Sequence, residues 1–180
     1  MATSSRATYG NLGSAIGPPY AEAFMDLKVN VFDAWTFRKT GSGIEYLLLH
    51  TSQHKADRYF NGGRFWQIPS GAIEGTERVV AAIARVLENF GLTASGIWAA
   101  EHAYAIYNRR FECMQLIGVY AAEVKPGPIQ LDPAEHADHR WCSYEQAQSL
   151  IHYRGLKDGL RSTREYVTGL DTPSAELRLM

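Results

Sequence analysis

The order of the predicted elements indicates an α+β domain with helices layered on a sheet. Two predicted β-hairpins are separated by a helix, and two further helices follow the second hairpin. Strands that alternated singly with helices would instead predict a doubly wound parallel sheet. A chain of 180 residues fits one domain and can bury a proper core. We therefore expect a single α+β domain, with α/β/α layering.

Alternation of apolar and polar residues predicts the first hairpin. Residues 27–38 alternate through Val29 and Val31 to Trp35, which is typical of a strand. The sequence Thr-Gly-Ser-Gly at 40–43 has the composition of a turn, and residues 44–50 form the more buried returning strand. No helix or strand is assigned to the polar stretch 51–64. Residues 65–69 are a short extended piece, and residues 70–75 are a loop.

The strongest helix signal covers residues 76–90 and ends at Gly91, a residue that adopts the left-handed cap conformation cheaply. Aromatic and β-branched residues predict a second hairpin over 97–106 and 111–124. A loop over 125–139 and a short strand over 140–142 follow. Ser143 is expected to cap a helix over 144–151, and a final helix is expected over 156–167.

Composition restricts the classes of protein to which the chain can belong. The formal net charge is −1 with acids and bases interspersed, which argues against coating an extended nucleic acid. No apolar run approaches the roughly 20 residues that span a bilayer. The two cysteines form no CxxC pair, so a reducing cytoplasm is the default location. We expect a flexible N-terminal arm over 1–24, a domain over 25–170 and a C-terminal tail over 171–180.

Two carboxylates share one face of the predicted 76–90 helix. At about 100° per residue, Glu77 and Glu88 fall near Ala81 and Ala84, opposite the apolar stripe. The small alanines leave room on this face for another segment of backbone, a metal or a phosphate. Solvated helix acids are common, and an acid in the first turn is favoured by the helix dipole whatever its function.

The segments around this helix resemble the Nudix box. Residues 68–77, Ile-Pro-Ser-Gly-Ala-Ile-Glu-Gly-Thr-Glu, are similar to the entry motif L-P-G-G-x-x-E-x-G-E, and residues 86–92 are similar to its closing part. Residues 119–124 and 135–147 resemble later segments of the branch with dATP and dihydroneopterin-triphosphate pyrophosphohydrolases. The resemblance covers about residues 27–168. It implies the Nudix-type α/β/α sandwich with a mixed central sheet.

The resemblance also implies chemistry, namely hydrolysis of a nucleoside-diphosphate-linked substrate with Mg²⁺ or Mn²⁺. Metal ions held by carboxylates would bridge pyrophosphate oxygens and activate a water. The residues that this implies for the metal are Glu74, Glu77, Glu88 and Gly71. The implied catalytic residues are Glu88, Glu77, Arg85, which would steady developing charge, and Glu135, a ligand or general base from a loop.

The closing part of the box can be aligned in two registers. Counted back from Gly91, the three helix glutamates of the family fall on Arg85, Glu88 and Asn89. Counted forward from Gly71, Glu77 and Arg85 take their expected places. The acids that follow the arginine are then Val86, Asn89 and Phe90. We prefer the first register, because an amphipathic helix does not tolerate a slip.

The remaining candidates concern the ligand. Tyr59, Phe60 and Trp66 could stack on a base, and Arg64 could contact phosphate. A ligand that resembles a nucleotide is therefore the expected partner, and the N-terminal arm leaves a homodimer open. Because neither register restores every acid, the rival interpretation is an inactive Nudix domain that binds a nucleotide or a protein partner.

Overall fold

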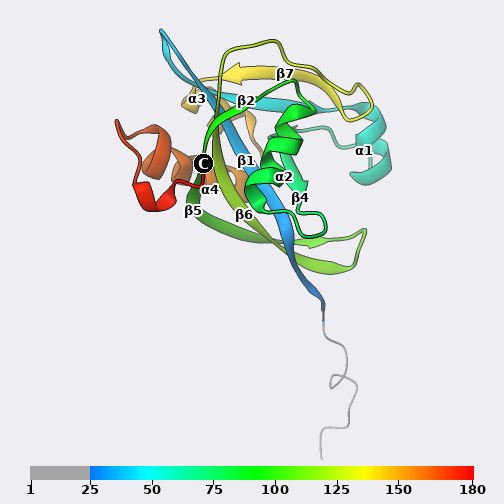
Figure 1. Cartoon of the computed structure of the whole chain (residues 1–180). Coiled ribbons are helices and arrows are strands. Elements are labelled where there is room, and N and C mark those ends of the chain that lie inside the picture. Colours follow the sequence, from blue (N-terminus) through cyan, green and yellow to red (C-terminus); the bar gives the residue numbers. More distant parts are fainter. Residues whose placement is uncertain (1–24) are drawn as a thin grey trace, which may run out of the picture.

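The computed structural model describes residues 25–180 and contains one mixed seven-stranded sheet (Figure 1). The main strand order is β3 (Trp66–Gln67), β2 (Gly43–Thr51), β1 (Leu27–Thr40), β6 (Cys113–Val124) and β5 (Ala94–Asn108). In addition, β4 (Ser70–Ala72) pairs with β1, and β7 (His136–Cys142) pairs with β2. The β1–β6 pair is parallel and the others are antiparallel, so the expected mixed sheet is confirmed.

Successive residues of the central strands enter two separate hydrophobic clusters. On β2, Leu47 and Leu49 pack toward α2 (Val79–Glu88), whereas Tyr46 and Leu48 pack toward α3 (Tyr144–Leu150) and α4 (Arg154–Thr163). This follows from the period of two in a strand, which sends alternate side chains to opposite faces. Figure 1 shows α2 in front of the sheet and α3 and α4 at its other side. The expected α/β/α layering is confirmed.

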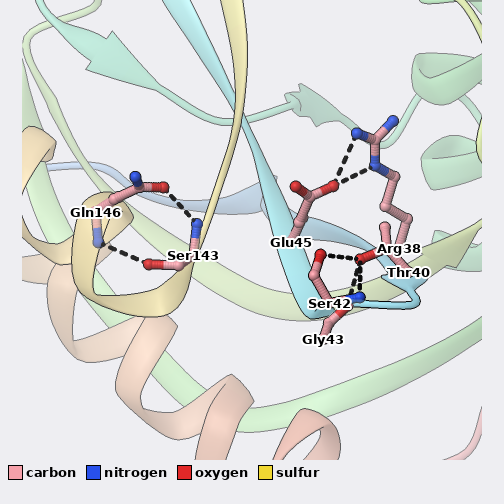
Figure 2. A network of polar contacts seen from close by, with 7 residues as sticks. All are labelled: Arg38, Thr40, Ser42, Gly43, Glu45, Ser143 and Gln146. Atoms are coloured by element: carbon pink, nitrogen blue, oxygen red, sulfur yellow. Dashed lines mark hydrogen bonds and ion pairs between the residues drawn. The ribbon is translucent and has the colours of Figure 1, made fainter.

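Local polar contacts fix the hairpin turn and the start of α3 (Figure 2). Thr40 Oγ1 contacts Ser42 Oγ at 2.9 Å and donates to the carbonyl of Gly43 at 3.0 Å. Two residues further from the turn on each strand, Arg38 pairs with Glu45 at 2.8 Å, directly across the ladder. At α3, Ser143 and Gln146 form a reciprocal capping box. These contacts explain why the turn and the cap fall where the composition predicted them.

The end of the chain lies against the sheet. After α4, a short π-helical segment covers Arg164–Thr168, and a 3₁₀ turn covers Ala175–Leu177. The amide of Leu179 then donates to the carbonyl of Ile97 at 2.8 Å. The expected arm over 1–24 lies outside the described residues. Among residues 25–180, no helix is long and apolar enough to cross a membrane.

Several expectations about the elements were wrong, including the loop over 125–139, whose last residues belong to β7. The polar stretch contains a helix, α1 (Gln53–Tyr59), whose cap is Ser52: its side chain accepts from the Lys55 amide. Helix α1 was not predicted from the sequence because its apolar pattern is weak: Ala56 is its only buried residue. Residues 70–72 form β4 rather than a loop, because they pair with β1. The main helix begins at Val79 and ends at Glu88, so Glu77 lies before it.

Candidate functional site

The entry segment of the motif is held close to both β1 and α2. In β4, Gly71 pairs with Phe32 and Ala72 pairs with Val31. A Cβ atom at Gly71 would lie 2.7 Å from Val86 Cγ2, which is closer than real Cβ atoms come to a neighbour. Residue 71 therefore has to be glycine for the strand to pack this tightly on the helix. Its expected role in metal binding stays a prediction.

Arg85 of α2 reaches back to the loop that precedes the helix. Its guanidinium lies 2.6 Å from Glu77 Oε1 and 3.2 Å from Glu74 Oε1, and it also donates to the carbonyl of Ala72 at 2.9 Å. Glu77 Oε1 in turn accepts from the amide of Glu74 at 2.8 Å. The hydrogen bond from Arg85, followed by that from the Glu74 amide, lowers the pKa of Glu77. One arginine thus engages both acids.

The predicted carboxylate pair does not come together on one helix face. Glu77 lies before the first turn and is bound to Arg85, whereas Glu88 is exposed at the opposite end of α2. The premise that both acids share a helix face was wrong, because the helix starts at Val79, three residues later than expected. Across residues 25–180, no three His, Cys, Asp or Glu side chains converge as a metal-binding group.

The Arg85–Glu77 contact bears on the register of the motif. These are the two residues that the alignment from Gly71 places in family positions, and they touch. The geometry favours that alignment over the one we preferred. The positions of the later family acids are then Val86, Asn89 and Phe90. An aliphatic, an amide and an aromatic side chain do not supply the anionic oxygen ligands that Mg²⁺ requires. The residues present do not fit the family's metal cluster.

The same three residues line one concave site, which we call the polar hollow. It has a volume of about 490 Å³. Facing α2 across it, Lys55 of α1 forms an ion pair with Glu135 at 2.8 Å. Burial, with the nearby Lys55 charge, lowers the pKa of His136 to about 4. An ammonium group and a neutral imidazole therefore occupy the side of the site where Glu135 was expected to help hold a metal.

A larger cavity of about 650 Å³, the aromatic pocket, adjoins the hollow, because Ile68 and Ser70 line both. It opens between β1, the β5–β6 hairpin and the start of α4. Its aromatic and polar lining residues include Asp33, Phe60, Phe65, Gln67, His102, Tyr104 and Tyr153. Of these, only Phe60 was expected from the sequence.

One signal in the sequence could have revealed this pocket. Asp33 has the same strand parity as Trp35 and Phe37, so it lies on a buried face. A carboxylate at such a position is rare unless it is paired or functional. The other lining residues come from segments too far apart in the sequence for any spacing to connect them.

The remaining expected ligand residues lie outside the aromatic pocket's lining. Tyr59 has the guanidinium groups of Arg58 and Arg110 over its ring, 5.1 and 5.0 Å from the centroid. Arg64 donates to the carbonyl of Thr51 at 3.0 Å. Trp66 packs against His50, with ring centroids 4.7 Å apart. These contacts give Arg64 and Trp66 structural partners within the sheet.

Comparisons with known proteins agree with this architecture. The NUDIX domain family matches residues 28–162. The fold is similar to a NUDIX hydrolase structure from Listeria monocytogenes (20% identity, TM-score 0.67, covering 82% of this chain and 99% of that one). An Ap4A hydrolase from C. elegans matches with 22% identity and a TM-score of 0.63, covering 79% of this chain and 99% of that one. No curated protein gives a match.

A third similar structure holds a ligand. The NUDIX domain of Shewanella oneidensis NrtR, complexed with ADP ribose, matches with 18% identity and a TM-score of 0.60, covering 84% of this chain and 94% of that one. At these identities the structures show a shared fold. The family match spans three quarters of the sequence, so this chain belongs to the NUDIX domain family.

Proposed function

We propose that this NUDIX domain binds a nucleoside-diphosphate-type ligand without the family's carboxylate-bound metal. The observation that carries the proposal is the adjacency of two sites with complementary chemistry: the aromatic pocket and the polar hollow share Ile68 and Ser70. The aromatic pocket suits a base, because any nucleobase presents a π-face. Its volume lies within the range of small-molecule sites.

In the polar hollow, Lys55 would neutralise phosphate in place of a metal ion. The Lys55 ammonium is held at 2.8 Å from Glu135, so it is already positioned at the wall of the site. A lysine acts as a compact point charge for phosphate. Arg85, by contrast, is bound to Glu77, Glu74 and Ala72 and anchors the preceding loop. The ADP ribose complex of the NrtR domain shows that a similar fold accommodates a diphosphate ligand.

Calorimetry with ADP and ADP-ribose, in EDTA and again in Mg²⁺, tests this proposal. We expect the affinity to be similar in both buffers and to fall about tenfold in Lys55→Met, which removes one charge-assisted contact. Lys39→Met is the matched control, because Lys39 is exposed on β1 and pairs with Glu123 at 3.4 Å. Binding that requires Mg²⁺, or that is unchanged in Lys55→Met, would contradict the proposal.

A second candidate is hydrolysis of a nucleoside-diphosphate-linked substrate with Mg²⁺ or Mn²⁺. Family membership and the acids Glu74, Glu77, Glu88 and Glu135 favour it. A pyrophosphatase assay over nucleotides and nucleotide sugars distinguishes the candidates, since only a hydrolase releases product. If turnover is found and survives Glu88→Gln unchanged, Glu88 has no catalytic role.

A further inference from the structure

The lining of the aromatic pocket includes a buried carboxylate. Asp33 of β1 is only 5% exposed and lines the cavity. The hydroxyl of Tyr104, on β5, donates to its Oδ2 atom. Within residues 25–180, no other side chain donates to the Asp33 carboxylate. Because a carboxylate has about four acceptor positions, Asp33 retains acceptor capacity toward the pocket.

Two buried nitrogen atoms of residues that line the aromatic pocket have no partner. Gln67 Nε2 and His102 Nε2 are inaccessible and make no hydrogen bond within the described part of the chain, although both residues line the same pocket. Leaving such a group unsatisfied costs about 1–3 kcal/mol, so nearly all buried polar groups are paired. An acceptor and two unpartnered nitrogens around one cavity indicate a site built to be completed by a ligand.

The walls of the pocket suit a flat ring. Phe65 packs edge-on against Tyr153, with ring centroids 5.0 Å apart, and against Phe60 at 4.9 Å. Among the same lining residues, the ring of His102 stacks on that of Tyr104, with centroids 5.9 Å apart. These rings offer π-faces to a planar ligand, and Asp33 and Gln67 line the same cavity.

We propose that the aromatic pocket selects a guanine base, with Asp33 accepting hydrogen bonds from its N1–H and N2–H groups and Gln67 donating to O6. A guanine edge presents two adjacent donors beside an acceptor, which matches a cavity whose lining offers both a carboxylate and an unpartnered amide N–H. Adenine has a single amino donor beside an acceptor ring nitrogen. The lone pair of that nitrogen would face the Asp33 carboxylate and be repelled by it. The inference rests on the proposed function and names its ligand class.

The charge state of Asp33 agrees with this role. Burial raises the pKa of Asp33 to about 6, with the Tyr104 hydrogen bond opposing the shift. At pH 7.5 the carboxyl is therefore still ionised and acts only as an acceptor. Tyr104 keeps its proton, because burial and the Asp33 charge raise its pKa well above the usual value.

The test compares GDP, IDP and ADP by calorimetry at pH 7.5. IDP differs from GDP only in lacking the 2-amino group. We expect GDP to bind about tenfold more tightly than IDP, and IDP more tightly than ADP, since a good bidentate pair contributes at least this discrimination. Asp33→Asn should abolish the GDP preference. Asp57→Asn, on the exposed face of α1, is the matched control.

The outcomes separate the two proposals. Equal affinity for GDP and ADP in the wild-type protein, or a preference that survives Asp33→Asn, would overturn the base assignment while leaving diphosphate binding intact. A failure of all three diphosphates to bind would overturn both. The comparison of GDP with IDP uses only the wild-type chain, so it does not depend on the folding of any variant.

Discussion

The guanidinium of Arg85 lies 2.6 Å from the carboxylate of Glu77, eight residues earlier in the chain. The contact joins the last turn of α2 to the loop that enters the helix, and the same guanidinium reaches Glu74 and the carbonyl of Ala72. Arg85 therefore acts as the anchor of this loop. The two acids that it binds are ones we expected to hold a metal.

Arg85→Ala should release the 72–77 loop. The variant loses two ion pairs and a hydrogen bond to backbone, so the amides of Ile73 to Glu77 should exchange faster with solvent. Hydrogen exchange followed by mass spectrometry measures this, with Arg78→Ala as the control at the neighbouring cap position. Protection of this loop that is the same in both variants would show that Arg85 is not its anchor.

Restoring acids to the polar hollow should create a divalent cation site. In Val86→Glu/Asn89→Glu, two new carboxylates would line the hollow that already contains Asp132 and Glu135. The variant should be stabilised by Mn²⁺, by about 2.7 kcal/mol at a concentration 100 times its Kd, whereas the wild type should not respond. Thermal unfolding with and without Mn²⁺ measures the effect.

The control for that experiment is Ala81→Glu, which adds an acid on the exposed face of α2. It should show no stabilisation by Mn²⁺. A wild-type protein that Mn²⁺ stabilises as much as the double variant would mean that the native residues already bind the ion.

Asp33 should make the protein less stable as the pH rises from about 4 to 6. Its pKa is raised from 3.8 to about 6 in the folded state, so the folded state holds the proton more tightly than the unfolded state. Stability contributed by the protonated form is then lost as the carboxyl ionises, by up to about 3 kcal/mol. In the wild type the opposing titration of His136 partly masks this loss, so urea denaturation at several pH values should show it in full in the His136→Gln variant. Adding Asp33→Asn should remove this loss of stability. A pH dependence of stability that is unchanged by Asp33→Asn would refute the assignment of the loss to Asp33.

His136 should have the opposite effect over nearly the same range. Burial lowers its pKa from 6.5 to about 4, so the unfolded state takes up the proton first as the pH falls. Stability should decrease by about 2 kcal/mol between pH 6.5 and 4, a value reduced for partial exposure. His136→Gln should retain stability in acid. In the wild type the two groups partly cancel, so each single variant should have a steeper pH profile than the parent.

The elements that could be predicted from the sequence are those whose structure is determined by interactions between residues close in the chain. The first hairpin alternates with a period of two and turns on a Thr-Gly-Ser-Gly sequence, and α3 begins at a capping box. Local rules were sufficient in both cases. They failed for α1, whose only buried residue is Ala56 and which is fixed by its Ser52 cap.

The site was less predictable because it is assembled from distant segments. Asp33 and Tyr104 are 71 residues apart, and only the pairing of β1 with β6 and of β6 with β5 brings them together. Within the motif itself, the expected start of the helix was wrong. A helix start displaced by three residues moves Glu77 off the helix and into the reach of Arg85.

Ser52 determines how far the polar hollow can change its width. The side-chain hydroxyl of Ser52 caps α1 and also donates to the carbonyl of Ala134 at 2.5 Å. The backbone amide of Ser52 donates to the carbonyl of Glu135 at 3.1 Å. Ser52 thus connects the start of the helix that contains Lys55 to the segment that contains Glu135, although the two segments are more than 80 residues apart in the sequence. Widening the hollow on this side would break both bonds between Ser52 and residues 134–135, so these bonds oppose a change in the distance between the two segments.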